Sequence, residues 1–300
     1  MPNDKLKNYL HLHLIVFIWG FTAVLGALIS IEAIPLVWYR MTLATVIIGL
    51  YVLFVKARLR FGKTTIFGFC FAGFLIALHW LCFFGAIKAS NVSITLAVMS
   101  TGAFFTAFLE PLLYWRRIVW YEVIFGFLAM VGLYIIFDVE TEYTMGLLLA
   151  LAASFLGALF TVINGRYAVK YSATSITFYE LGFGALCISL YLLYSGDFAN
   201  SGFFELSTAD WWYLILLASV CTAYAFIASV HVMKWISPFT VVLTVNLEPV
   251  YGILLALVIL GDSEQMSPQF YYGALLILAA VLANGFIKIR KSRKRTAQGS

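Results

Sequence analysis

Five ionisable residues stand inside long apolar runs of this sequence, where charge is otherwise rare. In chain order they are Arg40, His79, Glu110, Glu180 and Glu248. A charge at the centre of a membrane helix costs ~2.5–3.5 kcal/mol on insertion scales, so a residue of this kind is by default a candidate for binding or proton transfer. A guanidinium, an imidazole and carboxylates together can hold the opposite charges of a small amphoteric solute.

Glu248 stands beside a proline in the run TVNLEPVYG, residues 244–252. Pro249 has no N–H to donate to the carbonyl of Val245, so we expect the helix to kink or unwind there. Carbonyl groups freed at membrane depth face protein or a watered cavity. Glu248 is therefore a candidate cation or ammonium site, or a proton carrier, with Asn246 as a polar neighbour. The alternative is a structural kink in which protonated Glu248 bonds to a neighbouring helix.

Arg40 and His79 fall at similar predicted depths in two different apolar runs. A guanidinium that faces a cavity can hold a carboxylate through two parallel bonds, so Arg40 is a candidate for contact with a solute or a gate. An anchoring role for Arg40 is the alternative. The ordinary pKa of an imidazole, ~6.5, makes His79 a candidate for proton coupling. The alternative for His79 is a core histidine that donates to a backbone carbonyl.

The remaining candidates are less specific. Glu110 lies near the end of its run, where it can pair with Arg116 or Arg117 at the membrane surface, and Glu180 is open between a structural and a gating role. Aromatic side chains can wall a pocket and contact an ammonium group, although packing alone is the commoner role. Those at suitable depth are Trp19, Tyr39, Trp80, Tyr179 and Tyr224, and Ser100 is a further candidate.

The composition indicates that these residues lie in a polytopic membrane protein. The chain of 300 residues is 63% hydrophobic and 11% charged, with a mean hydropathy of +0.97, whereas soluble domains carry ~25% charged residues. A membrane helix needs ~20 apolar residues. Ten runs approach that length: 10–29, 35–55, 66–87, 92–114, 120–137, 145–164, 174–194, 211–232, 238–260 and 270–288.

The charges between the runs predict the topology. With the N-terminus in the cytoplasm, all but two of the 19 basic residues, Arg40 and Lys88, fall in cytoplasmic loops or termini, and most of the 14 acids fall outside. This is the distribution of the positive-inside rule. We therefore expect both termini in the cytoplasm. The basic segment KIRKSRKR then serves as a topology anchor that contacts anionic lipid, and not as a nucleic-acid site.

Weak internal similarity predicts two inverted repeats. The segment 86–105 aligns with 232–251, which places Lys88 over Lys234, and 38–44 aligns with 178–184. Five segments in each half force the second half into the opposite orientation, an arrangement typical of secondary transporters with a midplane site. The expected units are a first five-helix repeat over 1–142, a second, inverted one over 143–290, and a basic tail over 291–300.

In its order of motifs the sequence resembles the EamA-type ten-helix transporters of the drug/metabolite transporter superfamily. The motifs are FIWGFTAV (17–24), YRMTLA (39–44), GAIKASNVSITL (85–96), EPVYGILLALVILGD (248–262) and GALLILAAVLANG (273–285). The resemblance implies alternating-access transport, often export, of small polar metabolites such as amino acids. Where the family tends to have a proline, midway along the fourth segment, this chain has Gly102-Ala103. At this point the sequence departs from the family pattern, and the resemblance therefore does not imply that the two halves are equally mobile.

We expect a secondary transporter in a bacterial inner membrane that exports small amphoteric solutes, with possible proton or ion coupling and a monomeric or weakly dimeric state. A membrane-embedded enzyme that acts on a lipid-linked substrate is the alternative, but the acids fall on different segments and form no catalytic cluster. No nucleotide motif is present. Four cysteines without ligand spacing predict free thiols, and we expect no cofactor and no metal.

Overall fold

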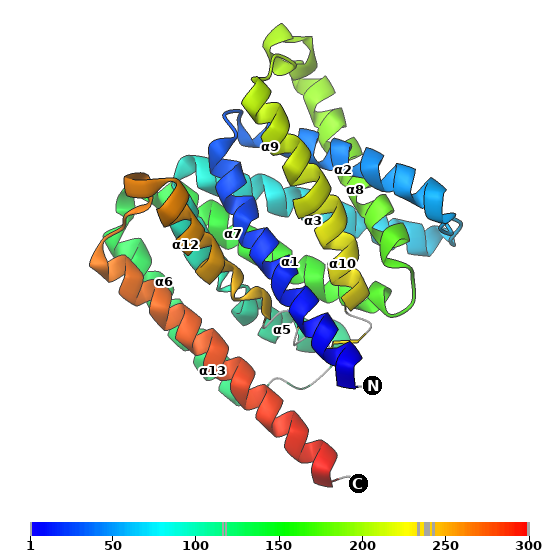
Figure 1. Ribbon diagram of the computed structural model, residues 1–300. Helices are drawn as coiled ribbons and strands as arrows, with labels where there is room; N and C mark the ends of the chain where they lie inside the picture. The colour runs from blue at the N-terminus through cyan, green and yellow to red at the C-terminus, as the bar shows by residue number, and fades with distance from the viewer. Residues whose placement is uncertain are drawn as a thin grey trace.

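The described chain is built from helices joined by turns (Figure 1). This computed structural model describes residues 2–115, 117, 119–232, 235–236, 241 and 244–298. Both chain ends lie at the lower end of the bundle in the view of Figure 1. We name this the terminal end. The opposite end, where α1 (Pro2–Leu28) finishes and α2 (Ala33–Val55) begins, is the distal end.

Helices α1 and α2 are followed by four more in the first half of the chain. These are α3 (Lys63–Ala89), α4 (Val92–Met99), α5 (Gly102–Tyr114) and α6 (Trp120–Val139). The second half contains α7 (Thr144–Ala168), α8 (Ala173–Ser195), α9 (Thr208–Ala218), α10 (Ala225–Val232), α12 (Glu248–Ile259) and α13 (Pro268–Gln298). A π-helical stretch, Ser219–Tyr224, joins α9 to α10.

Local sequence explains several helix boundaries. Asn91 caps α4 by accepting a bond from the backbone N–H of Ile94 at 2.9 Å, and Ser207 caps α9 in the same way from Asp210 at 3.0 Å. Such caps satisfy N–H groups that the first helical turn leaves free. Helix α8 ends at Gly196, whose φ of 81° suits a residue without Cβ.

In the described part of the chain, eight helices are long and apolar enough to cross a membrane, and they account for eight of the ten runs expected from the sequence. They are Lys7–Leu28, Ala33–Val55, Lys63–Ala89, Val92–Tyr114, Thr141–Ala168, Ala173–Ser195, Thr208–Val232 and Pro268–Ile287. Two further apolar stretches, Trp120–Ile136 within α6 and Glu248–Ile259 of α12, are shorter. Within the run expected over 238–260, helix α12 begins at Glu248 and ends at Ile259. Residues 238–240 and 242–243 of this run lie outside the described part of the chain.

Large apolar side chains cover the outer faces of the helices. Phe54 on α2 is 83% exposed and Val258 on α12 is equally so. Soluble proteins rarely expose apolar surface so widely, whereas lipid tails accept it. Together with the apolar helices, this surface identifies an integral, multi-pass membrane protein.

Helix contacts follow one pattern in both halves. Helix α3 packs against α7 and α8, and the continuous helix formed by α9, the π-helical stretch and α10 packs in the same way against α1 and α2. Helix α4 contacts α7 as α12 contacts α1. The pairs α2 with α8, α4 with α12 and α6 with α13 each join a helix to its counterpart. The lengthwise contact of α6 with α13 is visible at the lower left of Figure 1.

Two helices are interrupted at equivalent positions. Residues Asn246 and Leu247 form a turn directly before α12, and Ser100 and Thr101 form a turn between α4 and α5. The alignment of Lys88 with Lys234 places these two turns over each other. In the first half the Thr101 hydroxyl donates to the Val98 carbonyl at 2.7 Å, a local bond that competes with the helix. A break in the first half therefore forms without a proline.

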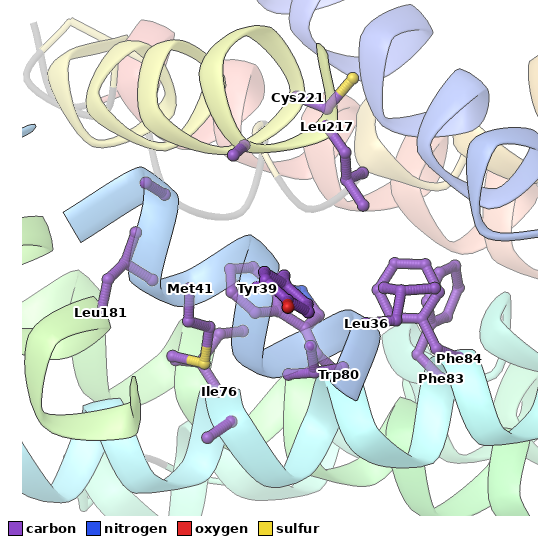
Figure 2. Close-up of a cluster of buried hydrophobic side chains, with 14 of the residues drawn as sticks. Leu36, Tyr39, Met41, Ile76, Trp80, Phe83, Phe84, Leu181, Leu217 and Cys221 are labelled. Atoms are coloured by element: carbon purple, nitrogen blue, oxygen red, sulfur yellow. The ribbon is translucent and has the colours of Figure 1, made fainter. Parts of the chain in front are cut away.

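The main core joins the two halves (Figure 2). Leu36 and Met41 of α2 and Ile76 of α3 are buried together with Leu181 of α8 and Leu217 of α9. Phe83 and Phe84 of α3 pack edge-on at 5.1 Å between ring centroids. Trp80 lies in the same cluster, and it also faces the cavity described below.

Candidate functional site

A cavity of about 180 Å³ lies between the two halves of the chain. The first half lines it with residues of α1, α2, α3, α4 and α5, and the second half with residues of α7, α10, and the segment around the turn before α12. Its polar and ionisable lining includes Arg40, His79, Asn164, Asn246 and Glu248. The walls are largely aromatic, namely Trp19, Trp80, Phe83, Phe160 and Phe226. The cavity is therefore a polar site with apolar walls at the interface of the halves.

Arg40 is held in place by two neighbours. It is only 1% exposed, its Nε donates to the Thr222 hydroxyl at 2.7 Å, and its guanidinium carbon lies 3.8 Å from the centroid of the Trp80 ring. Stacking on an aromatic face stabilises a cation. Its Nη1 has no hydrogen-bond acceptor among the described residues. Arg40 thus lines the cavity as a cation held in one position, and its Nη1 can still donate a hydrogen bond.

Thr222 is presented to Arg40 by the π-helical stretch. Its hydroxyl donates to the Leu217 carbonyl, five residues back, at 2.7 Å and accepts the Arg40 bond. Single π-helical turns inside α-helices occur frequently at functional sites. Sequence reasoning did not identify Thr222, because a π-helical turn leaves no mark in hydropathy.

His79 has one ring nitrogen committed and one free to act. Its Nδ1 lies 2.7 Å from the Ala153 carbonyl oxygen. Because a carbonyl only accepts, Nδ1 carries the hydrogen, and in the neutral ring Nε2 is then an acceptor. The ring stacks against Phe83, and Gly157 leaves it room, since a Cβ there would lie 2.9 Å from Nδ1. The structure thus contains the carbonyl bond of the core alternative, while His79 also lines the cavity.

Glu248 is the first residue of α12, and Pro249 follows in the first turn, where a proline needs no N–H partner. Both line the cavity. Helices α1 and α12 approach closely beside them, because a Cβ on Gly20 would lie 2.9 Å from the Gly252 backbone nitrogen. Glu248 and Arg40 thus line the same cavity from opposite halves of the chain.

Three side-chain nitrogens of the lining are buried without an acceptor among the described residues. They are Arg40 Nη1, Trp19 Nε1 and Asn246 Nδ2. A buried donor left unpaired costs about 1–3 kcal/mol. A solute that brings acceptor oxygens would relieve that cost. The lining therefore favours a ligand with a carboxylate or a similar group.

Other residues expected from the sequence lie outside the cavity lining. The Tyr39 hydroxyl donates to the Phe203 carbonyl at 3.2 Å, and that of Tyr179 donates to the Leu59 carbonyl at 2.6 Å. Ser100 lies in the turn between α4 and α5 and donates to the Leu96 carbonyl at 3.3 Å. Tyr224 contacts His11, with 2.7 Å between its hydroxyl and the imidazole Nε2.

Glu110 and Glu180 do not line the cavity either. Glu110 lies half-buried near the end of α5. Of its two expected partners, Arg116 falls outside the described residues and Arg117 is exposed. Glu180 is fully buried on α8 and is bonded to Asn164, a lining residue that sequence reasoning also missed. Asparagine is uncharged, so a search for intramembrane charges passes over it.

Buried carboxylates close the distal end across the two halves. Asp210 accepts the backbone N–H and the hydroxyl of Ser30, each at 2.7 Å. Glu264 accepts the backbone N–H groups of Val92 at 3.1 Å and Ser93 at 2.8 Å. Hydrogen bonds to an ionised acceptor are stronger than neutral ones. We name these bonds, with that of Ser267 to Glu140 at 2.8 Å, the distal contacts.

The cavity reaches from the level of Arg40 toward the terminal end. Asn164 near the end of α7, Thr106 of α5 and Val230 of α10 line its terminal side. The acids of the distal contacts are absent from the lining. Among the described residues, the distal contacts join the halves at one end of the cavity. At the terminal end the halves are also joined, beside the cavity, by the bonds of Tyr179 to the Leu59 carbonyl and of Ser175 to the Arg58 carbonyl.

Residues 6–138 and 144–286 of the chain each match the EamA-like transporter family. An uncharacterized transporter of Archaeoglobus fulgidus is 26% identical over 155 residues, which are 52% of this chain and 53% of the relative. The chain thus aligns with about half the length of that relative. A solved crystal structure with 16% identity and a TM-score of 0.65 covers 93% of this chain and 97% of its own, which shows a shared fold. The two matches to the family, over residues 6–138 and 144–286, span nearly the whole sequence, and the chain therefore belongs to the EamA-like transporter family.

Proposed function

We propose that this chain is a secondary transporter that exports small amphoteric metabolites of the amino-acid class. The observation that carries the proposal is the cavity between the halves, whose lining includes Arg40 from the first half and Glu248 from the second. Membership of a transporter family makes solute movement the expected use of such a cavity. The solute would cross by alternating exposure of this cavity to the two membrane faces.

The lining supports a solute with both charges. A carboxylate can pair with Arg40 and take bonds from Trp19 and Asn246, whose nitrogens lack acceptors. An ammonium group can pair with Glu248 and lie against an aromatic face such as Trp19. The volume of about 180 Å³ is below the ~300–1,000 Å³ of sites for drug-sized ligands, so the solute is small.

The repeated pattern of helix contacts supports two inverted five-helix halves, over 1–142 and 143–290, with the basic tail at 291–300. Inverted repeats commonly work by rocking one half against the other around a central site. In this account the ten expected segments all cross the membrane, the shorter apolar stretches of α6 and α12 included. The distal contacts would break and the terminal side would close when the site opens to the other face.

The distribution of basic residues supports cytoplasmic termini in a bacterial inner membrane. The cavity then extends toward the cytoplasm, which suits loading of a solute for export. A fluorescent protein that matures only in the cytoplasm, fused after Ser300, tests this topology. Absence of fluorescence with normal expression would reverse the orientation and with it the inferred direction.

A transport assay with the purified protein in proteoliposomes tests the class of solute. Proteoliposomes would be assayed for counterflow with radiolabelled amino acids, with amines that lack the carboxylate and with acids that lack the amine. We expect counterflow only for solutes that carry both groups. Equal counterflow of an amine and its parent amino acid would show that Arg40 holds no carboxylate, and no counterflow of any amphoteric solute would contradict the proposed class.

A further inference from the structure

A second polar cluster lies directly behind the cavity, between α7 and α8. Glu180 is 0% exposed and Asn164 is 2% exposed, and the Asn164 Nδ2 donates to the Glu180 Oε2 at 3.3 Å. Helix α3 presses on the same place, because a Cβ on Gly73 would lie 2.3 Å from the Glu180 carbonyl oxygen. The Glu180 carboxyl is therefore enclosed in protein. Among the described residues, Asn164 is the hydrogen-bond partner that connects it to the cavity.

The ionisable groups of the surrounding helices leave Glu180 without a counter-charge. On the described helices that pack against α8, Arg40 donates to Thr222, His79 to the Ala153 carbonyl, Lys88 to the Ile29 carbonyl and Tyr39 to the Phe203 carbonyl. The remaining charged or imidazole groups of these helices, Lys63, Arg166 and His231, are exposed. On α8 itself Tyr179 donates to the Leu59 carbonyl. An ionised Glu180 would be an uncompensated buried charge, which is strongly destabilising.

The unpaired atoms of the cluster indicate where a hydrogen belongs. Glu180 Oε1 and Asn164 Oδ1 both lack a partner among the described residues. A proton on Glu180 Oε1 would give both of these oxygens a partner, because the carboxyl O–H can donate to the amide oxygen. Protonated Glu180 would donate to Asn164 Oδ1 while accepting from Nδ2, which completes a two-bond acid–amide pair and removes the buried charge.

We propose that Glu180 is a proton-binding site, distinct from the solute cavity and reached through Asn164, whose proton is the coupling ion of transport. This inference rests on the proposed function. When the halves move and the Asn164 side chain turns, the O–H bond of Glu180 breaks, the proton passes to a water molecule of the cavity, and the electron pair stays on the carboxylate. Rebinding of a proton from the other side restores the neutral pair.

Transport in proteoliposomes tests the coupling with a radiolabelled mixture of L-amino acids as the probe. If one proton moves per solute, a gradient of one pH unit supports about a tenfold concentration ratio. We expect that ratio for the wild-type protein and a ratio of about one for Glu180→Gln, while solute exchange at equal pH continues in both. Glutamine keeps the size of the side chain and can pair with Asn164. Glu110→Gln, a neutralised acid outside the cavity, should behave as wild type.

The outcomes separate this inference from the proposed function. A Glu180→Gln protein that still concentrates the amino acids in a pH gradient would overturn the proton site and leave the transporter assignment intact. If the wild-type protein exchanges no amino acid, the proposed function fails, and the proton site is tested on the same protein with dicyclohexylcarbodiimide. This reagent adds across a protonated carboxyl to give an N-acylurea with no leaving group. Mass mapping of the adduct to Glu180, with none in Glu180→Gln, would support the site, and an unmodified Glu180 would overturn it.

Discussion

Asp210 at the start of α9 accepts two hydrogen bonds from Ser30, one from its backbone N–H and one from its hydroxyl, each at 2.7 Å. The two residues belong to opposite halves of the chain, and both bonds lie at the distal end. The Ser207 hydroxyl also donates to the same carboxylate, at 2.6 Å, and holds it in position. An opening of the distal end has to separate Ser30 from Asp210.

Asp210→Asn should therefore favour the distally open state. A hydrogen bond to a charged group contributes about 1.5–3 kcal/mol, so loss of one shifts the population by about tenfold or more. In a protein whose native cysteines are replaced by alanine, Thr22→Cys in the cavity should react faster with an impermeant maleimide added at the distal side. Asp262→Asn is the matched control, because Asp262 is exposed and its carboxylate accepts a bond from nearby Gln265 within the same turn. Equal labelling rates in the two variants would contradict a closing role for Asp210.

Arg40→Lys should weaken solute binding more than it weakens the fold. Lysine keeps the charge but cannot pair with a carboxylate through two parallel bonds, so we expect the KM for amphoteric solutes to rise about tenfold or more. Thr222→Val removes the bond that orients the guanidinium and should raise KM by a smaller factor. Measured KM values that stay at the wild-type level in Arg40→Lys would show that Arg40 serves only to anchor α2.

His79→Asn separates the two nitrogens of the imidazole. The asparagine amide can replace the Nδ1 bond to the Ala153 carbonyl but cannot reproduce Nε2. We expect normal folding, weaker solute exchange and an unchanged response to a pH gradient. If this variant loses the pH response while Glu180→Gln retains it, His79 and not Glu180 carries the coupling proton.

Gly20→Val should destabilise the protein, because α1 and α12 touch at this point. The added Cβ would lie 2.9 Å from the Gly252 nitrogen, and overpacking costs about 1–3 kcal/mol or more. Gly62→Val is the control, since nothing lies within 4 Å of its added Cβ. The check is thermal unfolding in detergent. An unchanged midpoint for Gly20→Val would mean that the helices are not in close contact.

Hydropathy predicted most of the membrane helices, while the topology predicted from the charges stays a prediction. The membrane class and the apolar runs follow from the sequence because crossing hydrocarbon demands long apolar helices. The family follows from the resemblance of the motifs and their order. The rotation of each helix about its own axis does not follow, because lipid and protein interior are both apolar and leave no polar face to read. Tyr39 and Tyr179 consequently lie outside the cavity although their depth is suitable.

Features that depend on local hydrogen bonding could not be predicted from the sequence either. The break at Ser100 and Thr101 lacks a proline and depends on hydroxyl bonds to carbonyls. Asp210 and Glu264 were expected only as acids of outer loops, yet they are buried and bond across the halves. Asn164 carries no charge, so only the structure reveals its place in the cavity lining and its contact with Glu180.

Counterflow with paired variants tests the central claim most directly. The chain contains two Glu-Pro pairs, Glu248-Pro249 in the cavity lining and Glu110-Pro111 outside it. With radiolabelled amino acids in proteoliposomes at equal pH, Glu248→Gln should reduce the initial rate of counterflow by about tenfold or more, as expected for loss of one charge-assisted contact. Glu110→Gln should retain the wild-type rate. Equal rates in the two variants would contradict the assignment of Glu248 to the solute site.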